Sequence, residues 1–330
     1  MRPIDEQLTK YLTDAHSIEV QALAQLKAAP GMAGSPDLAS IYRLHYDETQ
    51  EQERWLRERL QAREADPSRL KDLLGAAGGV GMVWFAKSQP DTPGKLAAHA
   101  FAYEHMELAA YDLLERVAQH GGDTETAEVA RKIRAQEDAM AARIGDTWDR
   151  AVEESLREAE KDDLDKSLVK YLADAHAIEA QAIRLLKTAP SLARDEELAR
   201  LYEQHLEETR EHQRLVEARL DAHDASRSLI KDTALRLGGL NLGAFFGAQP
   251  DTPAKLAGFS YAFEHLEIGA YEQLKRVAQR AGDEETAQVA ERILAQERAA
   301  AEKIYARFGP AMDATLGDAK PSATAAASSR

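Results

Sequence analysis

The sequence predicts an all-α protein made of two tandem four-helix bundles, and three observations lead to this fold class. The composition is rich in Ala, Leu, Glu, Arg and Gln and only 6% aromatic, which favours helices over sheets. Long runs carry apolar residues at helical spacing. Residues near 8–144 also match residues near 168–304 at a constant offset of 160, without a gap. Because this offset is far longer than a solenoid repeat, each copy is a whole domain.

The first two helices of copy 1 follow from their periodicity. Apolar residues at helical spacing predict a helix over Ile4–Ala28, and a Pro, Gly and Ser cluster at residues 30–36 ends it. A second run predicts a helix from Asp37 to about Ala65. An irregular stretch follows, in which we expect one short helix at Ser68–Leu74.

Two further helices complete the copy. Thr92 and Pro93 are typical of a helix start and open a third helix, which runs to about His120. The segment Gly121-Gly122-Asp123-Thr124 ends it and caps a fourth helix from about Glu125 to Glu158 or beyond. Four long helices with one long connection, between the second and third, describe the one-crossover topology of ferritin-like folds. The alternative is an up-down bundle with a disordered insert.

The offset of 160 extends this assignment to the whole chain. We expect a ferritin-like four-helix bundle at residues 1–158, a second at 159–310 and a disordered tail at 311–330, where large apolar residues at helical spacing are lacking. Each copy should dock on the other as an intramolecular pseudo-dimer.

Composition excludes several functions. With 42 basic and 57 acidic residues the net charge is −15, which disfavours nucleic acid as a partner. The absence of cysteine excludes disulfides, thiolate zinc sites, iron–sulfur clusters and cysteine nucleophiles. The N-terminal residues have no apolar signal region, and the longest apolar stretch, Leu73–Ala86, is too short to cross a membrane. We therefore expect a cytoplasmic protein that does not associate with membranes.

Glutamates interrupt the apolar stripe of every long helix. In copy 1 these are Glu19, Glu48, Glu104, Glu107 and Glu137, and in copy 2 they are Glu179, Glu208, Glu264, Glu267 and Glu297. Carboxylates that converge in a bundle interior repel one another and lose their hydration, so a cation must compensate them. The alternative is that they lie at the border of each stripe and reach solvent, or pair with Arg54, Arg131 or Arg134.

Oxygen donors with an occasional imidazole suit iron or manganese, at most two ions per bundle, although zinc can compete. Three histidine positions are shared by the copies, His16/His176, His45/His205 and His105/His265, and each either orients a carboxylate or packs in the core. The copies differ at one inward position, where copy 1 has Gln52 and copy 2 has His212. Since His212 lies four residues after Glu208, we expect both to address one metal and copy 2 to bind metal more tightly. The alternative is that His212 points to the border of the helix and pairs with a neighbouring carboxylate.

Several motifs resemble those of the YciE/YciF-type ferritin-like proteins of bacterial stress responses. The motifs are D-A-x-x-x-E from Asp14 and Asp174, H-x-x-E-T from His45 and His205, and E-H-x-E-x-x-x-Y from Glu104 and Glu264. With Glu137 and Glu297 the resemblance covers roughly 300 of the 330 residues, as two family domains in tandem. It implies a metal-binding four-helix bundle that usually dimerises.

The fourth helix departs from the pattern of ferritin-like oxidases, which place a histidine three residues after the glutamate. Met140 and Ala300 occupy that position here, and Ala141 and Ala301 follow. The resulting expectation is a di-metal carboxylate protein, with iron as the expected metal, that binds iron or carries out peroxide or oxygen chemistry under stress. Enzymatic turnover, of a di-iron oxidase or peroxidase kind, stays open. The alternative is a non-enzymatic helical scaffold or interaction protein with a vestigial metal site.

Overall fold

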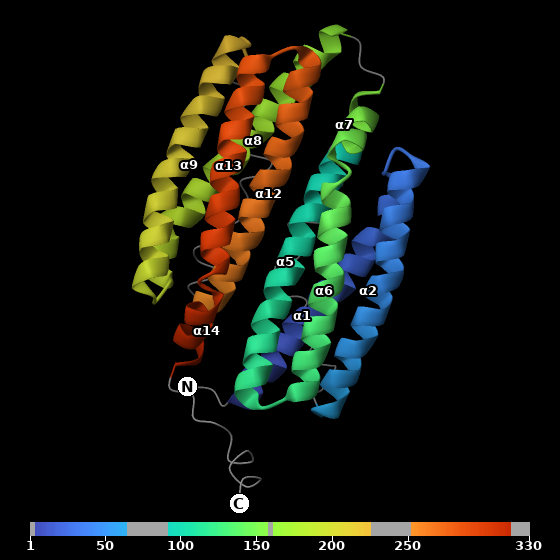
Figure 1. Ribbon diagram of the computed structural model, residues 1–330, viewed down its shortest axis with the longest axis vertical. Helices are drawn as coiled ribbons and strands as arrows, with labels where there is room; N and C mark the ends of the chain where they lie inside the picture. Colours follow the sequence, from blue (N-terminus) through green and yellow to red (C-terminus); the bar gives the residue numbers. More distant parts are fainter. Residues whose placement is uncertain (1–3, 65–91, 158–160, 226–251, 318–330) are drawn as a thin grey trace, which may run out of the picture.

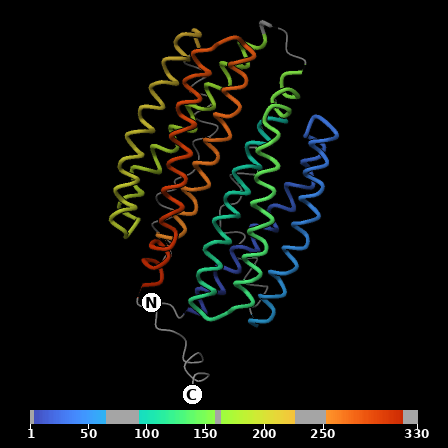
Figure 2. Tube along the Cα trace, in the orientation of Figure 1, coloured from blue at the N-terminus to red at the C-terminus, as the bar shows by residue number. Residues whose placement is uncertain are grey.

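The computed structural model describes residues 4–64, 92–157, 161–225 and 252–317, and every regular element in these ranges is a helix. The all-α prediction is therefore confirmed. The short helix expected at Ser68–Leu74 lies outside the described residues. The tube in Figure 2 shows that the long helices of both bundles run roughly along the long axis of the molecule.

Copy 1 contains α1 (Ile4–Leu26), the short 3-10 helix η1 (Ala29–Gly31), α2 (Pro36–Ala62), α5 (Thr92–Gly121), α6 (Thr124–Gly145) and α7 (Trp148–Leu156). Copy 2 contains α8 (Lys161–Leu192), α9 (Glu196–Ala222), α12 (Thr252–Ala281), α13 (Glu284–Tyr305) and α14 (Phe308–Leu316). The Gly-Gly-Asp-Thr segment separates α5 from α6, as predicted. Gly122 adopts a φ of +71°, and the Asp123 side chain caps α6 by accepting a hydrogen bond from Thr126 N at 3.0 Å.

Each bundle has the same helix order. In copy 1, α1 packs against α2 and α5, and α6 also packs against α5 and α2, so α2 and α5 lie across the diagonal. In copy 2, α8 and α13 both pack against α9 and α12 in the same way. The long connection from the second to the third long helix of each copy therefore links diagonal helices. Figure 1 shows the two bundles side by side, copy 2 in yellow to red and copy 1 mainly in blue and teal.

Helices α5 and α12 form most of the contact between the copies. A Cβ atom at Gly269 would lie 3.1 Å from Ala98 Cβ, and one at Gly258 would lie 3.4 Å from Ala109 Cβ. Since an early residue of each helix meets a late residue of the other, the two helices run antiparallel. Small side chains at these positions allow the backbones to approach closely.

Two ion pairs between the copies are related by the offset of 160. Lys95 Nζ lies 2.7 Å from Asp174 Oδ2, and its counterpart Lys255 binds Asp14. Between them the rings of His105 and His265 stack with centroids 3.5 Å apart and planes 14° apart. The same residues of the two copies therefore meet each other across one axis.

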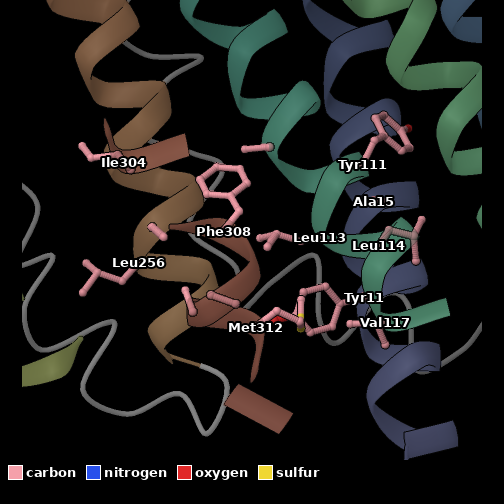
Figure 3. Packing of buried hydrophobic residues seen from close by; sticks show 14 of the residues in the cluster. Tyr11, Ala15, Tyr111, Leu113, Leu114, Val117, Leu256, Ile304, Phe308 and Met312 are labelled. Atoms are coloured by element: carbon pink, nitrogen blue, oxygen red, sulfur yellow. The ribbon is translucent and has the colours of Figure 1, made fainter. Parts of the chain in front are cut away.

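The fourth helix and the tail differ from expectation. The helix expected to run from Glu125 to Glu158 ends at Gly145, and the separate helix α7 begins at Trp148. The prediction of a disordered tail from residue 311 is wrong for residues 311–316, because α14 continues to Leu316. Both short helices bury apolar residues against α5 and α12. Figure 3 shows Phe308 and Met312 of α14 in the same core as Leu113 and Tyr11 of copy 1.

Candidate metal centre

The predicted inward glutamates of α1, α5, α6, α8, α12 and α13 lie in the bundle interiors. Their residue exposures are at most 3%, and the eight are Glu19, Glu104, Glu107, Glu137, Glu179, Glu264, Glu267 and Glu297. Each sits on a stripe of buried residues of its helix, with apolar neighbours one turn before and after. On α5, Glu104 and Glu107 are three residues apart and therefore share a face. Each bundle thus buries four of the predicted glutamates.

In copy 1 four side chains bring potential donor atoms together. One atom from each of His45, Glu104, Glu107 and Glu137 lies within 4.8 Å of the others, and we call this set the copy 1 group. His45 Nε2 lies 2.8 Å from Glu104 Oε1. Helices α2, α5 and α6 supply these donors, so the bundle must be assembled before the group exists.

Glu19 on α1 lies beside the copy 1 group. The Tyr111 hydroxyl donates a hydrogen bond to Glu19 Oε1, and Gln52 Nε2 donates one to Glu137 Oε1. Burial, together with the nearby Glu137 charge, raises the pKa of Glu19 well above its usual range, and the bond from Tyr111 opposes this shift. Tyr111 therefore holds one oxygen of Glu19 in a fixed direction.

Copy 2 repeats this arrangement and adds to it. His205, Glu264, Glu267 and Glu297 form the copy 2 group, with His205 Nε2 2.9 Å from Glu264 Oε2. A second set, the His212 group, consists of Glu179, His212 and Glu297. Glu297 belongs to both groups, so its two oxygens could face two ions.

The His212 group exists because an imidazole replaces the amide of Gln52. His212 Nδ1 lies 2.7 Å from Glu297 Oε1 and 3.7 Å from Glu179 Oε1. The neighbouring carboxylates outweigh burial and raise the pKa of His212. The Tyr271 hydroxyl donates to Glu179 Oε1, as Tyr111 does to Glu19.

Burial controls the protonation of these carboxyl groups. Loss of hydration is the largest cause that raises the pKa of Glu104 to about 8, Glu179 to about 8 and Glu297 to about 7. Burial and the neighbouring glutamates raise the pKa of Glu107 and Glu267 well above the usual range. Without a cation, several of these groups therefore hold protons near neutral pH.

Glu107 and Glu267 are the most exceptional of the eight. Each is fully buried, yet among the described residues neither of its carboxylate oxygens has a hydrogen-bond partner. A buried polar atom without a partner costs about 1–3 kcal/mol, and a charged one costs more. Two equivalent residues that both carry this cost point to a partner that the polypeptide does not supply.

Three of the predicted glutamates lie outside all three groups. Glu19 is buried beside the copy 1 group, whereas Glu48 and Glu208 lie at the border of their helices. The Glu48 side chain is 24% exposed and lies 3.6 Å from Arg143, and the Glu208 side chain is 27% exposed. His205 Nδ1 lies 3.2 Å from Glu208 Oε2, and this hydrogen bond is the main cause that lowers the pKa of Glu208 to about 2. Glu208 and His212, which the sequence pattern paired, therefore face different partners.

Sequence reasoning gave His45 and His205 only an orienting or packing role, whereas the structure places both among the donors. The buried residues of α2 include Tyr42, His45, Thr49, Gln52 and Leu56, a spacing of three and four that runs through His45 and leaves out Glu48. The sequence pattern allows either Glu48 or Thr49 to lie on the inner face of this helix. The prediction took Glu48 as the inward residue, whereas Thr49 is the one that the structure buries.

The other shared histidines and the arginines lie elsewhere. His16 binds Glu53 and His176 binds Glu217, both at 2.9 Å. The three arginines considered as partners for the inward glutamates bind other acids: Arg54 lies near Glu51 and Glu58, Arg131 binds Glu115, and Arg134 binds Asp112 and Glu115. Among the described residues, no ion pair links these arginines to the eight buried glutamates, which weakens the alternative of border pairing.

Comparison with known proteins gives the family. The chain matches the family described as Domain of unknown function (DUF892) twice, over residues 4–157 and 163–315, and it belongs to that family as a tandem of two domains. No solved structure matches the chain. Within the described residues, no helix combines the length and the apolar character needed to cross a membrane.

Proposed function

We propose that each bundle binds divalent transition metal at its buried glutamates, with iron or manganese as the native ion. The observation that carries this proposal is the pair Glu107 and Glu267, which are fully buried with both oxygens unpaired in both copies. A divalent cation would supply the missing partner for each. It would also offset the charge that four buried carboxylates acquire when they lose their protons.

The donor chemistry fits these ions. The copy 1 group and the copy 2 group each offer three carboxylates and one imidazole. Hard oxygen donors with an imidazole suit iron and manganese, with zinc as a competitor. His45 and His205 would bind through Nε2, the atom that faces Glu104 and Glu264. Tyr111 and Tyr271 would orient Glu19 and Glu179 through their hydroxyl groups.

The copies would differ in capacity. In copy 2 Glu297 belongs to two groups, so this bundle would hold two ions, one in the copy 2 group and one in the His212 group. In copy 1 the Gln52 amide donates to Glu137 where His212 stands in copy 2, and an amide N–H cannot bind a cation. Copy 1 would therefore hold one ion firmly and a second only weakly through Glu19.

Iron bound there would supply one-electron redox chemistry, which supports a role in iron binding or peroxide and oxygen chemistry during stress. The chain's own residues would exclude bulk water from the ions, since the donors are almost fully buried. The ferritin-like resemblance of the motifs supports the same role. Met140 and Ala300, both buried, add no oxygen or nitrogen donor at the position where ferritin-like oxidases have histidine. This absence favours metal binding over rapid turnover.

The test is metal analysis of the full chain, purified without chelator and supplied with iron or manganese during expression. We expect about three equivalents of transition metal per chain, one in copy 1 and two in copy 2. The matched variant replaces Glu107 and Glu267 by glutamine, and it should lose most of this metal while keeping its helical circular dichroism. Less than one equivalent in the parent would favour a helical scaffold with a vestigial site and would overturn the proposal.

We also propose that the contact between α5 and α12 persists in solution, which makes the chain a monomer with an internal pseudo-dimer. The paired ion pairs, Lys95 with Asp174 and Lys255 with Asp14, support this assembly. Light scattering after size exclusion at low micromolar concentration should give the mass of one chain. A chain-level dimer at that concentration would contradict it.

A further inference from the structure

Copy 1 contains a cavity of about 170 Å³ beside its candidate metal group. The second half of α1, the helix η1, the first third of α2 and the first third of α5 form its walls. His45 and Glu104 of the copy 1 group lie on one side, and apolar residues such as Leu26, Leu96 and Ala100 cover much of the rest. For comparison, an apolar protein cavity of about 150 Å³ is large enough to bind benzene.

The cavity also has a polar element that is independent of the metal group. His99 Nε2 and Gln25 Oε1 lie 2.9 Å apart, and both residues line the cavity. Burial lowers the pKa of His99 to about 4, so its ring is neutral at physiological pH. Gln25 Nε2 has no hydrogen-bond partner among the described residues and almost no accessible surface, so a rotation of the Gln25 side chain would present this unpaired amide donor to an occupant.

Copy 2 keeps the metal group but has lost this polar element. At the positions 160 residues later, Gln25 is replaced by Leu185 and His99 by Phe259. Phe259 packs on the apolar core, with its ring centroid 6.2 Å from that of Phe263, which replaces Tyr103. The residues that form the metal group are the same in both copies, so the group forms in copy 2 without this polar pair.

We propose that copy 1 binds a small, uncharged aromatic molecule with a hydroxyl group, of the phenol class, in this cavity. The ring would lie among the apolar side chains of α1 and α5, and Gln25 Nε2 would donate a hydrogen bond to the hydroxyl oxygen. An anionic ligand is disfavoured because Glu104 borders the same space. This inference goes beyond the proposed metal binding and does not depend on it, since Gln25 and His99 belong to none of the metal groups.

The probes are phenol and benzene, titrated into the full chain by calorimetry or by ligand-observed NMR, both after chelator treatment and with manganese present. We expect phenol to bind one site per chain in both states, with a Kd below about 1 mM. Benzene should bind about tenfold more weakly because it leaves the Gln25 amide unpaired. Equal binding of the two probes would exclude the hydrogen bond, and absence of phenol binding in both states would overturn the proposal.

Two variants close the cavity in different ways. Gln25→Leu with His99→Phe gives copy 1 the side chains that copy 2 carries, and Ala100→Leu fills space from α5 without touching the polar pair. Each should weaken phenol binding at least about tenfold. The reverse exchange in copy 2, Leu185→Gln with Phe259→His, is the matched control and should leave the Kd of the copy 1 site unchanged.

Circular dichroism and thermal melting show which variants are folded. If a folded cavity variant binds phenol as the parent does, the cavity in copy 1 is not the site. If the control weakens phenol binding as much as the cavity variants do, the effect does not come from copy 1, and the proposal is likewise refuted. Loss of metal binding in the Glu107 and Glu267 variant would leave phenol binding intact, so the two proposals fail separately.

Discussion

Replacing His212 by glutamine would give copy 2 the donor set of copy 1. His212 Nδ1 lies 2.7 Å from Glu297 and 3.7 Å from Glu179, and these three side chains form the His212 group. The variant would leave that group with two carboxylates, while the copy 2 group keeps its imidazole from His205. The size of the amide is close to that of the ring, so we expect little change in packing.

The expected loss of metal affinity follows from removing one imidazole from a site with three donor side chains. Losing a partner that only orients a ligand reduces metal affinity by about 10–100-fold, and losing a donor should cost at least as much. We therefore expect one of the ions in copy 2 to bind at least about tenfold more weakly in His212→Gln, with the others unchanged. The opposite change, Gln52→His, should strengthen one ion in copy 1.

The assay is titration of the metal-free full chain with Mn²⁺ against a competing chelator, because manganese(II) avoids oxidation by air during the measurement. The matched control is His176→Gln, which makes the same chemical change at a histidine that binds Glu217 outside the three groups. If the His212→Gln curve superimposes on those of the parent and the control, His212 is not a ligand and the asymmetry between the copies has no consequence for metal.

Three further predictions concern stability. First, the metal-free protein should be less stable at pH 8 than at pH 5. Burial raises the pKa of Glu104 and Glu179 in the folded state to about 8, so the folded state holds protons that the unfolded chain releases above about pH 4.5. The free energy of unfolding therefore falls as the pH rises from about 4.5 to about 8. Urea titrations at both pH values test this, and equal or greater stability at pH 8 would contradict it. Second, bound metal should counteract this loss of stability at high pH, because carboxylate ligands must lose their protons to bind a cation. The gain in Tm on adding Mn²⁺ should therefore grow from pH 5 to pH 8. A constant gain would argue against carboxylate ligands. Third, the double variant Glu107→Gln with Glu267→Gln should be more stable than the parent by about 1 kcal/mol or more at pH 8 without metal, because it removes buried acids whose ionisation opposes folding. It should also lose the gain in Tm that Mn²⁺ gives the parent. If the variant still responds to metal as the parent does, these residues are not ligands.

Much of the architecture could be predicted from the sequence because it depends on local periodicity and on the internal repeat. Helical spacing identified the helices, the segment around Gly122 and Asp123 marked a boundary that the structure confirms, and the offset of 160 transferred every element to copy 2. The repeat also contains a signal for the two short helices: Trp148, Ala151 and Val152 recur as Phe308, Ala311 and Met312, and all six are buried. This pattern would have extended the second domain past residue 310.

The membership of the candidate site depended on the rotation of each helix about its axis, which neighbouring helices set. From His45, a step of seven residues falls only about 20° short of two full turns and reaches the buried Gln52, whereas a step of three falls about 60° short of one turn and leaves Glu48 at the border. On helical periodicity alone, Gln52 and Glu48 both fit the inward-facing stripe of this helix. Only packing against α1 and α6 decided between them.

The sequence by itself determined that acids and imidazoles lie on the inner faces of eight long helices in two equivalent bundles, because residue spacing along one helix fixes which side chains share a face. The tertiary structure decided which of them meet. His212 reaches Glu179 and Glu297, the donors of each group come from different helices, and Gln25 lies against His99 in one cavity. These contacts between helices join residues 30–118 positions apart in the chain, and distances of that kind are set by how helices pack, which no local pattern encodes.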